Sequence, residues 1–210
     1  MSRKFALHLA RRGTTPLSEG EIRAVVAAAV RAPSVHNTQP WRLHSEGQQL
    51  TLSADRSRQL FSTDPSGSEL LLSCGAALFN IRVALRHLSR QPWVDLMPDP
   101  LEPDLLARVH FGSQAPRTVQ EEQLYAAVSR RHTHRGPFLP VPVEQEVLDA
   151  VQSATRAEGG ELFLVESGQP RRTLAAVAAA AERAPGAPPP GRHGSPGRPV
   201  VLLLHGFPEL

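Results

Sequence analysis

The sequence is poor in lysine, cysteine and aromatic residues. Only one of its 23 basic residues is a lysine, Lys4, and the arginines are scattered among 20 acidic residues, which gives a formal net charge of +3. Proteins that bind nucleic acid gather basic residues on one surface and interleave aromatic side chains, so this pattern predicts no nucleic-acid partner. A single cysteine, Cys74, excludes an intrachain disulfide and a cysteine-rich zinc site. Aromatic residues make up 5% of the chain, so we expect a core of Ala, Val and Leu.

Long hydrophobic runs are also missing. The first twelve residues contain no apolar segment of signal-peptide length, and the runs 25–30 and 200–204 are far too short to cross a bilayer. We therefore expect a cytoplasmic protein without a membrane partner. With 210 residues, 40% of them hydrophobic, the chain has room for one folded domain or for one and a fraction.

The hydrophobic pattern predicts alternating helices and strands. Residues 19–31 have a helical period, with Ser18 as N-cap and Glu21 completing a capping box. A turn at 46–48 predicts a β-hairpin. The further expected elements are a helix at 66–90, strands at 94–97 and 105–111, helices at 120–130, 142–157 and 171–183, and a strand at 162–165. Together with the hairpin, which spans 42–54, these elements predict an α+β fold in which an antiparallel or mixed sheet is flanked by helices.

The end of the chain differs in composition from the rest. Six of the 20 prolines lie within residues 185–199. We expect 184–199 to be a disordered linker, followed by a buried strand that begins at Val200.

One polar segment follows the first predicted helix. Residues 32–41 have the sequence Ala-Pro-Ser-Val-His-Asn-Thr-Gln-Pro-Trp. A neutral loop of amides, carbonyls and one carboxamide can hydrogen-bond the N and O atoms of a flavin ring. The alternative is a loop that ends the helix, in which Ser34 and Asn37 cap the following strand.

A second polar segment follows the predicted helix at 120–130. In an extended chain Arg131, Thr133 and Arg135 point the same way and can converge on one phosphate group. The alternative is a solvated basic linker. His132 and His134 also share a face, but no third ligand lies nearby in the sequence, so we predict no metal site.

The two segments resemble the nitroreductase family of flavoproteins, and more closely its Acg-like branch. Asp64-Pro65 and residues 73–78 fit that branch as well. The resemblance implies a nitroreductase-like fold that binds FMN, with no catalytic residue contributed by the protein. The cofactor-binding residues that it implies are Pro33, Ser34, Val35, Asn37 and Gln39 in the first segment and Arg131, Thr133 and Arg135 in the second.

The order of the segments implies a tandem protein. In the Acg-like branch two nitroreductase-like halves form one chain, and the resemblance places a first half at 1–117 and an incomplete second half at 118–183. The first half would supply the loop and the second the arginines of one composite FMN site. The last residues, 200–210, resemble the start of an α/β-hydrolase of the epoxide-hydrolase type. A gene fusion, a frameshift and a chance match are the alternative origins of this tail. We therefore expect a truncated chain.

The function implied is that of an oxidoreductase. FMN would pass electrons from a reductant such as NAD(P)H to a small-molecule acceptor, a nitroaromatic or a quinone. FMN sequestration without NAD(P)H turnover and an inactive truncated remnant are the alternatives, with a fragment of a hydrolase fusion as a minor one. A sheet edge left exposed by an incomplete second half makes a homodimer a further expectation.

Overall fold

The computed structural model describes residues 16–134, 136, 141–165, 172–173, 176–177, 180 and 200–204. The chain divides into two compact units, Met1–Thr133 and His134–Leu210, and each is described by itself. The expected linker at 184–199 and most of the expected helix at 171–183 lie outside the described residues.

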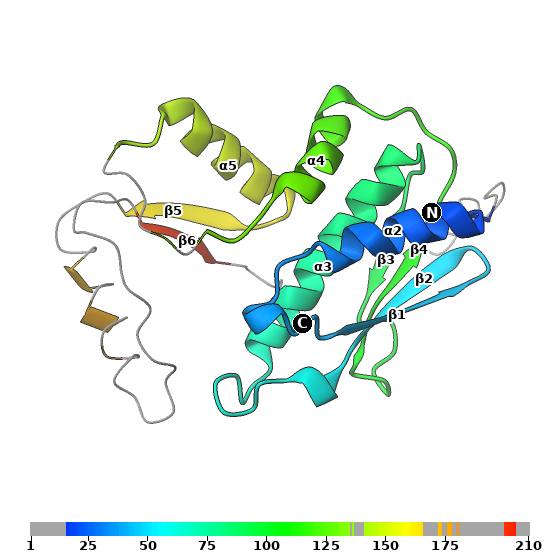
Figure 1. The fold of residues 1–210 in the computed structure, drawn as a ribbon, viewed down its shortest axis with the longest axis horizontal. Helices are drawn as coiled ribbons and strands as arrows, with labels where there is room; N and C mark the ends of the chain where they lie inside the picture. The colour runs from blue at the N-terminus through cyan, green and yellow to red at the C-terminus, as the bar shows by residue number, and fades with distance from the viewer. Residues whose placement is uncertain are drawn as a thin grey trace, which may run out of the picture. The chain divides into compact units, whose positions relative to one another are not determined.

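The first unit contains a four-stranded antiparallel sheet. Its strands are β1 (Trp41–Glu46), β2 (Gln49–Ala54), β3 (Trp93–Leu96) and β4 (Leu105–His110), in the order β1-β2-β4-β3 (Figure 1). The β1–β2 pair confirms the predicted hairpin. Along β2, Leu50, Leu52 and Ala54 are buried and alternate with half-buried residues, as expected for a strand with one face on a core.

Helices pack on this sheet. They are α2 (Glu19–Val30), α3 (Ser68–His87) and α4 (Val119–Arg130). α3 contacts β2 and β4, and α2 and α4 both pack against α3. The predicted capping box of α2 is present, because the amide of Glu21 donates to Ser18 Oγ and the amide of Ser18 donates to the Glu21 carboxylate. The α+β class with an antiparallel sheet flanked by helices is thus confirmed.

The core lies between the helices and the sheet. Its largest fully buried side chains are Phe111, Leu50, Leu52, Ile81, Leu85, Val25, Val109, Pro40 and Cys74. Among the described residues one helix, α3, is long and apolar enough to cross a membrane by length and composition. Half of its apolar window is buried inside the fold, which is where the core helix of a folded unit lies.

Helix α4 belongs to the first compact unit. Its Val128 is part of the core cluster that also contains Ile81 and Leu85 of α3. The compact unit consequently extends to Thr133. The division into two nitroreductase-like halves at 117 stays a prediction. Periodicity predicted the helix but could not indicate its packing partner.

The second unit contains α5 (Gln145–Ala157), β5 (Glu161–Val165) and β6 (Val200–Leu204). β5 and β6 pair antiparallel, with Glu161 opposite Leu204 and Val165 opposite Val200. The strand expected at 200–204 is therefore present, and it forms a two-stranded sheet with β5.

Candidate flavin-binding site

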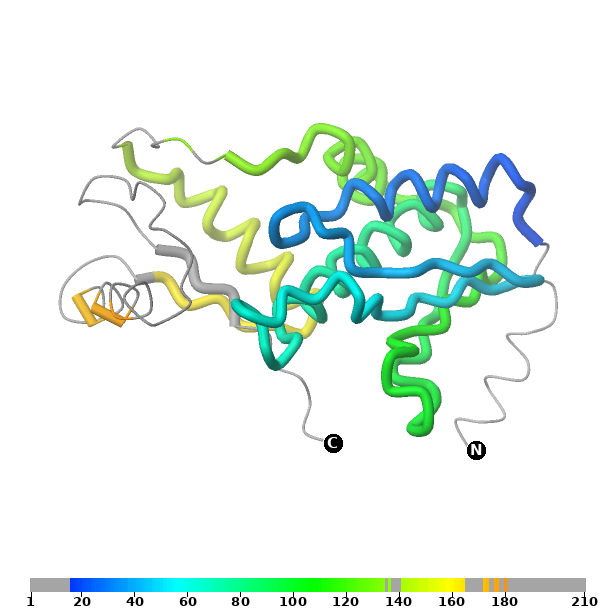
Figure 2. Tube along the Cα trace, turned by 60° about the horizontal axis from the view of Figure 1, so that its bottom comes forward, coloured from blue at the N-terminus to red at the C-terminus, as the bar shows by residue number. Residues whose placement is uncertain are grey.

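The polar loop between α2 and β1 reverses the chain direction (Figure 2). α2 ends at Val30, shortly before Pro33, as expected where proline disfavours helical backbone in the preceding residue. A short 3₁₀ turn, η1 (Val35–Asn37), follows. The loop is closed by its own polar groups, because the Gln39 amide donates to Ser34 Oγ at 3.0 Å and Gln39 Nε2 donates to the Val30 carbonyl at 3.1 Å.

Three loop residues other than glycine have left-handed backbone. The φ angles are +49° at His36, +57° at Asn37 and +47° at Gln39. Such conformations cost about 1–3 kcal/mol each and persist where the surroundings fix them, often at functional sites. The loop is therefore a candidate for function rather than a simple helix terminator.

The loop residues differ in how far they are exposed to solvent. Pro33 and Asn37 are exposed, whereas Ser34, Val35 and Gln39 are half-buried. The exposed Asn37 carboxamide has both donor and acceptor capacity, which suits the edge of a heteroaromatic ring. Gln39 also anchors the loop to α2, so its amide nitrogen is engaged within the protein.

The structure brings the second segment to this loop. Arg131 follows α4 directly, and its Nη2 donates to the carbonyl of Arg31 at 3.3 Å, next to the start of the loop. Arg131 and Thr133 are exposed, and Thr133 ends the first compact unit. Arg135 lies outside the described residues. The Arg131 guanidinium, next to the start of the loop, is a donor of the kind that phosphate oxygens accept.

An ion pair fixes α4 on α3 and thereby places Arg131. Arg86 donates to the Glu121 carboxylate through Nε at 2.6 Å and Nη2 at 3.0 Å, and its Nη2 also donates to the Pro116 carbonyl. Glu121 additionally accepts the Thr118 amide in a second capping box. The hydrogen bonds from Arg86, followed by that from the Thr118 backbone, lower the pKa of Glu121 to about 2.

This pKa predicts how the stability of the first unit depends on pH. A carboxyl group whose pKa is lower in the folded state stabilises the fold at pH values above its unfolded-state pKa, which is near 4.5. This stabilisation is lost as the pH falls through the folded-state pKa of about 2. We expect Glu121→Gln to lower the free energy of unfolding by about 1–2 kcal/mol at pH 7, because the substitution removes a charge-assisted pair. The difference from the unsubstituted protein should shrink towards pH 2 in urea titrations.

The matched control for this prediction is Glu19→Gln. Glu19 pairs with Arg23 on the surface, where the two side chains are 82% and 75% exposed, so this change should have almost no effect on stability. Equal losses for the two variants would contradict the proposed anchoring of α4.

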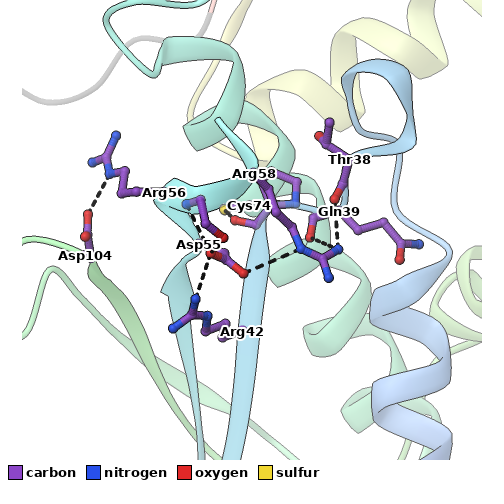
Figure 3. A network of polar contacts seen from close by, with 10 residues as sticks. Thr38, Gln39, Arg42, Asp55, Arg56, Arg58, Cys74 and Asp104 are labelled. Atoms are coloured by element: carbon purple, nitrogen blue, oxygen red, sulfur yellow. Dashed lines mark hydrogen bonds and ion pairs between the residues drawn. The ribbon is translucent and has the colours of Figure 1, made fainter. Parts of the chain in front are cut away.

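Sequence reasoning missed the polar residues that follow β2. Asp55 is buried, and its carboxylate accepts from Arg42 Nη2 at 2.9 Å and from Ser57 Oγ at 2.6 Å. Arg58, at the end of the short turn η2 (Arg56–Arg58), lies between Asp55 and the loop (Figure 3). The run Ala-Asp-Arg-Ser-Arg directly after a predicted strand was the available signal, because charged residues at strand ends commonly line sites.

Cys74 lies beneath the end of the loop that leads into β1. Its Sγ is 3.3 Å from the carbonyl oxygen of Pro40, to which it donates, and the residue is 1% exposed. Burial raises the pKa of the thiol to about 12. A thiol in this environment holds structure and does not act as a nucleophile.

We therefore expect Cys74 to be unreactive in the folded protein. A chromogenic disulfide reagent such as DTNB should release almost no colour from native protein at pH 8. The same sample in guanidinium chloride should react at one thiol per chain, because the sequence contains one cysteine. Rapid reaction in the native state would contradict this expectation, because it would show that the core around Cys74 and Pro40 opens easily to the reagent.

Sequence comparisons find relatives that are named as nitroreductases. No family model matches the chain. The Mycobacterium tuberculosis protein named "Putative NAD(P)H nitroreductase Rv3131" is 41% identical over 142 residues, which are 68% of this chain and 41% of that protein. "Putative NAD(P)H nitroreductase acg", from the same organism, is 38% identical over 146 residues, 67% of this chain and 44% of that protein. The chain thus spans less than half the length of these relatives.

A comparison of folds gives only a distant match. The structure titled as a putative nitroreductase in complex with FMN, from Desulfovibrio desulfuricans, is 19% identical and covers 58% of this chain and 95% of that chain. The TM-score of this match is 0.38.

Proposed function

Because the chain is related by sequence to the nitroreductase family over two thirds of its length, we propose that it is an FMN-binding, nitroreductase-like oxidoreductase. One observation supports this most strongly. The Nη2 of Arg131 reaches the carbonyl of Arg31, so the start of the second polar segment lies next to the residue that precedes the loop, within one compact unit. A basic linker that is only solvated would not be expected to make this contact.

The donors present fit FMN. We assign Arg131 and Thr133 to the phosphate group, since a guanidinium and a hydroxyl both donate to its oxygens. Asn37 and the hydroxyl of Ser34 are assigned to the polar edge of the ring, and Pro33 and Val35 to its faces, where they exclude water. Gln39 holds the loop shape that orients these groups, through its bonds to Ser34 and Val30. Arg135 is included in the phosphate site on the resemblance alone.

The bound flavin would supply two-electron redox chemistry, taking electrons from NAD(P)H and delivering them to a small nitroaromatic or quinone. The protein's own residues would bind and orient the cofactor and tune its environment. We propose the composite arrangement for this site: residues 1–117 contribute the loop, and the part of the second nitroreductase-like half within the first compact unit contributes Arg131.

The test is the absorbance of the purified chain after loading with FMN and gel filtration. The proposal predicts a yellow protein whose absorbance near the flavin maximum bleaches when NAD(P)H is added without oxygen. It also predicts that the colour returns with a quinone or nitroaromatic acceptor. A yellow protein that does not bleach would replace catalysis with flavin sequestration. Colourless protein with a folded circular-dichroism spectrum would contradict both.

A further inference from the structure

We propose that Arg58, held by Asp55, is a positioning residue that fixes the loop conformation with which the protein binds FMN. That FMN is the ligand rests on the proposed function. That Arg58 fixes the loop conformation is a statement about the ligand-free protein. Neither residue is in the two segments that resemble the family's cofactor motifs.

Asp55 is the fixed point of this arrangement. It directly follows β2, and its amide donates to the carbonyl of Pro40 at 3.0 Å, so its backbone is tied to the end of the loop. Its carboxylate also accepts from the amide and the hydroxyl of Ser57 and from Arg42. With the residue only 7% exposed, these bonds leave the carboxylate little freedom to move.

Arg58 links the fixed Asp55 carboxylate to the loop. Its Nε lies 3.5 Å from Asp55 Oδ2, and its Nη1 donates to the carbonyls of Thr38 at 3.0 Å and Gln39 at 3.4 Å (Figure 3). One planar guanidinium therefore contacts a buried carboxylate and two successive carbonyls. The ammonium of a lysine, a compact charge without a fixed fork, cannot reproduce this geometry at all three acceptors.

The contacted carbonyls belong to the strained part of the loop. Gln39 has left-handed backbone, and Asn37, immediately before Thr38, has it as well. These two carbonyls belong to the peptide groups on either side of Gln39, so holding both of them restrains the left-handed backbone at Gln39. Arg58 therefore acts on the shape of the loop through the backbone, so it is a positioning residue and need not touch the cofactor.

The sequence offers a matched control two residues away. Arg56 occupies the same turn and is also ion-paired, through Nε to Asp104 Oδ1 at 2.7 Å. It donates hydrogen bonds to two side chains outside the loop, those of Asp104 and Gln59. Arg56→Gln thus removes the same charge from the same turn without removing a bond to the loop carbonyls.

The experiment compares Arg58→Gln, Arg58→Lys and Arg56→Gln with the unsubstituted chain. Amide hydrogen exchange of the peptide covering 36–41 is measured without FMN, and then the FMN dissociation constant and the visible spectrum of the bound flavin are measured. We expect Arg58→Gln to speed loop exchange and weaken FMN binding about tenfold each, because charge-assisted bonds are lost. Arg58→Lys should recover part of both, and Arg56→Gln should match the unsubstituted chain.

The outcomes separate this inference from the proposed function. If the unsubstituted chain does not bind FMN, the proposed function fails, and the ligand part of the inference fails with it. If the unsubstituted chain binds FMN but Arg58→Gln and Arg56→Gln give the same exchange, affinity and flavin spectrum, the inference is overturned while the proposed function stands. Faster exchange only in Arg58→Gln, with a shifted flavin spectrum and an unchanged melting temperature, would support a positioning role.

Discussion

Replacing Gly112 with alanine is expected to lower the free energy of unfolding by about 3 kcal/mol or more. Gly112 follows β4 and Phe111, is buried, and has a φ of +71°. A Cβ at this position would overlap the carbonyl oxygen of Gln91 and would lie 2.6 Å from its carbonyl carbon. The obstacle is backbone, which cannot swing aside as a flexible side chain could.

The surroundings of Gly112 make relaxation costly. The amide of Gln91 donates to the carbonyl of Ser113 at 2.9 Å, and Arg90 forms an isolated β-bridge with Gln114. The two backbone segments therefore lie against each other at the edge of the core. Moving one to admit a methyl group would break these bonds or displace Phe111, which is fully buried.

Gly47→Ala is the control for this substitution. Gly47 lies in the β1–β2 turn with a φ of +60°, but nothing lies within 4 Å of its would-be Cβ. It should therefore show the backbone strain alone, about 1 kcal/mol. Urea unfolding followed by circular dichroism measures both variants. Equal losses would mean that the contact with Gln91 has no energetic weight.

Arg131→Ala is expected to weaken FMN binding between about tenfold and a hundredfold, with little change in stability. The side chain is exposed, and its one described bond is to the carbonyl of Arg31, so the fold loses little when it is removed. A phosphate group would lose a guanidinium that is available in a fork geometry. Quenching of FMN fluorescence on titration with protein measures the dissociation constant.

Arg130→Ala is the neighbouring comparison. Arg130 is also exposed, and its Nε donates to the carbonyl of Ala126 within its own helix. Loss of this arginine changes the net charge by the same amount and should leave FMN affinity within about twofold, because surface charge alone acts weakly at physiological salt. A similar weakening in both variants would indicate a diffuse charge effect and would argue against a phosphate site at Arg131.

The sequence was most informative where local chemistry decides the structure. Ser18 and Glu21 lie three residues apart before an apolar period, and the capping box that this spacing predicts is present. The boundaries of α3 were less accurate: a helix at 66–90 was expected, and the helix runs from Ser68 to His87. Left-handed backbone at Gly67 before it and at Ser89 after it sets these limits.

Long-range packing was beyond the reach of the sequence. The periodicity of α4 predicted a helix, but its place on α3 depends on the packing of Val128 in the core and on an ion pair between Arg86 and Glu121. Likewise, the loop residues were named from their types, whereas the role of Arg58 follows from carbonyls nineteen and twenty positions away. Such contacts arise only once β2 brings Asp55 alongside Pro40, and no residue pattern records that juxtaposition.

The central claim is that the loop at 33–39 and the segment beginning at Arg131 form one FMN site. Hydrogen exchange of the ligand-free and FMN-saturated protein tests it most directly. We predict that FMN slows exchange in the peptide covering 31–41 and in the peptide covering 126–133, and that Arg131→Ala reduces this protection at the same FMN concentration. Saturable FMN binding that protects neither peptide, or no saturable binding by the folded chain, would contradict the claim.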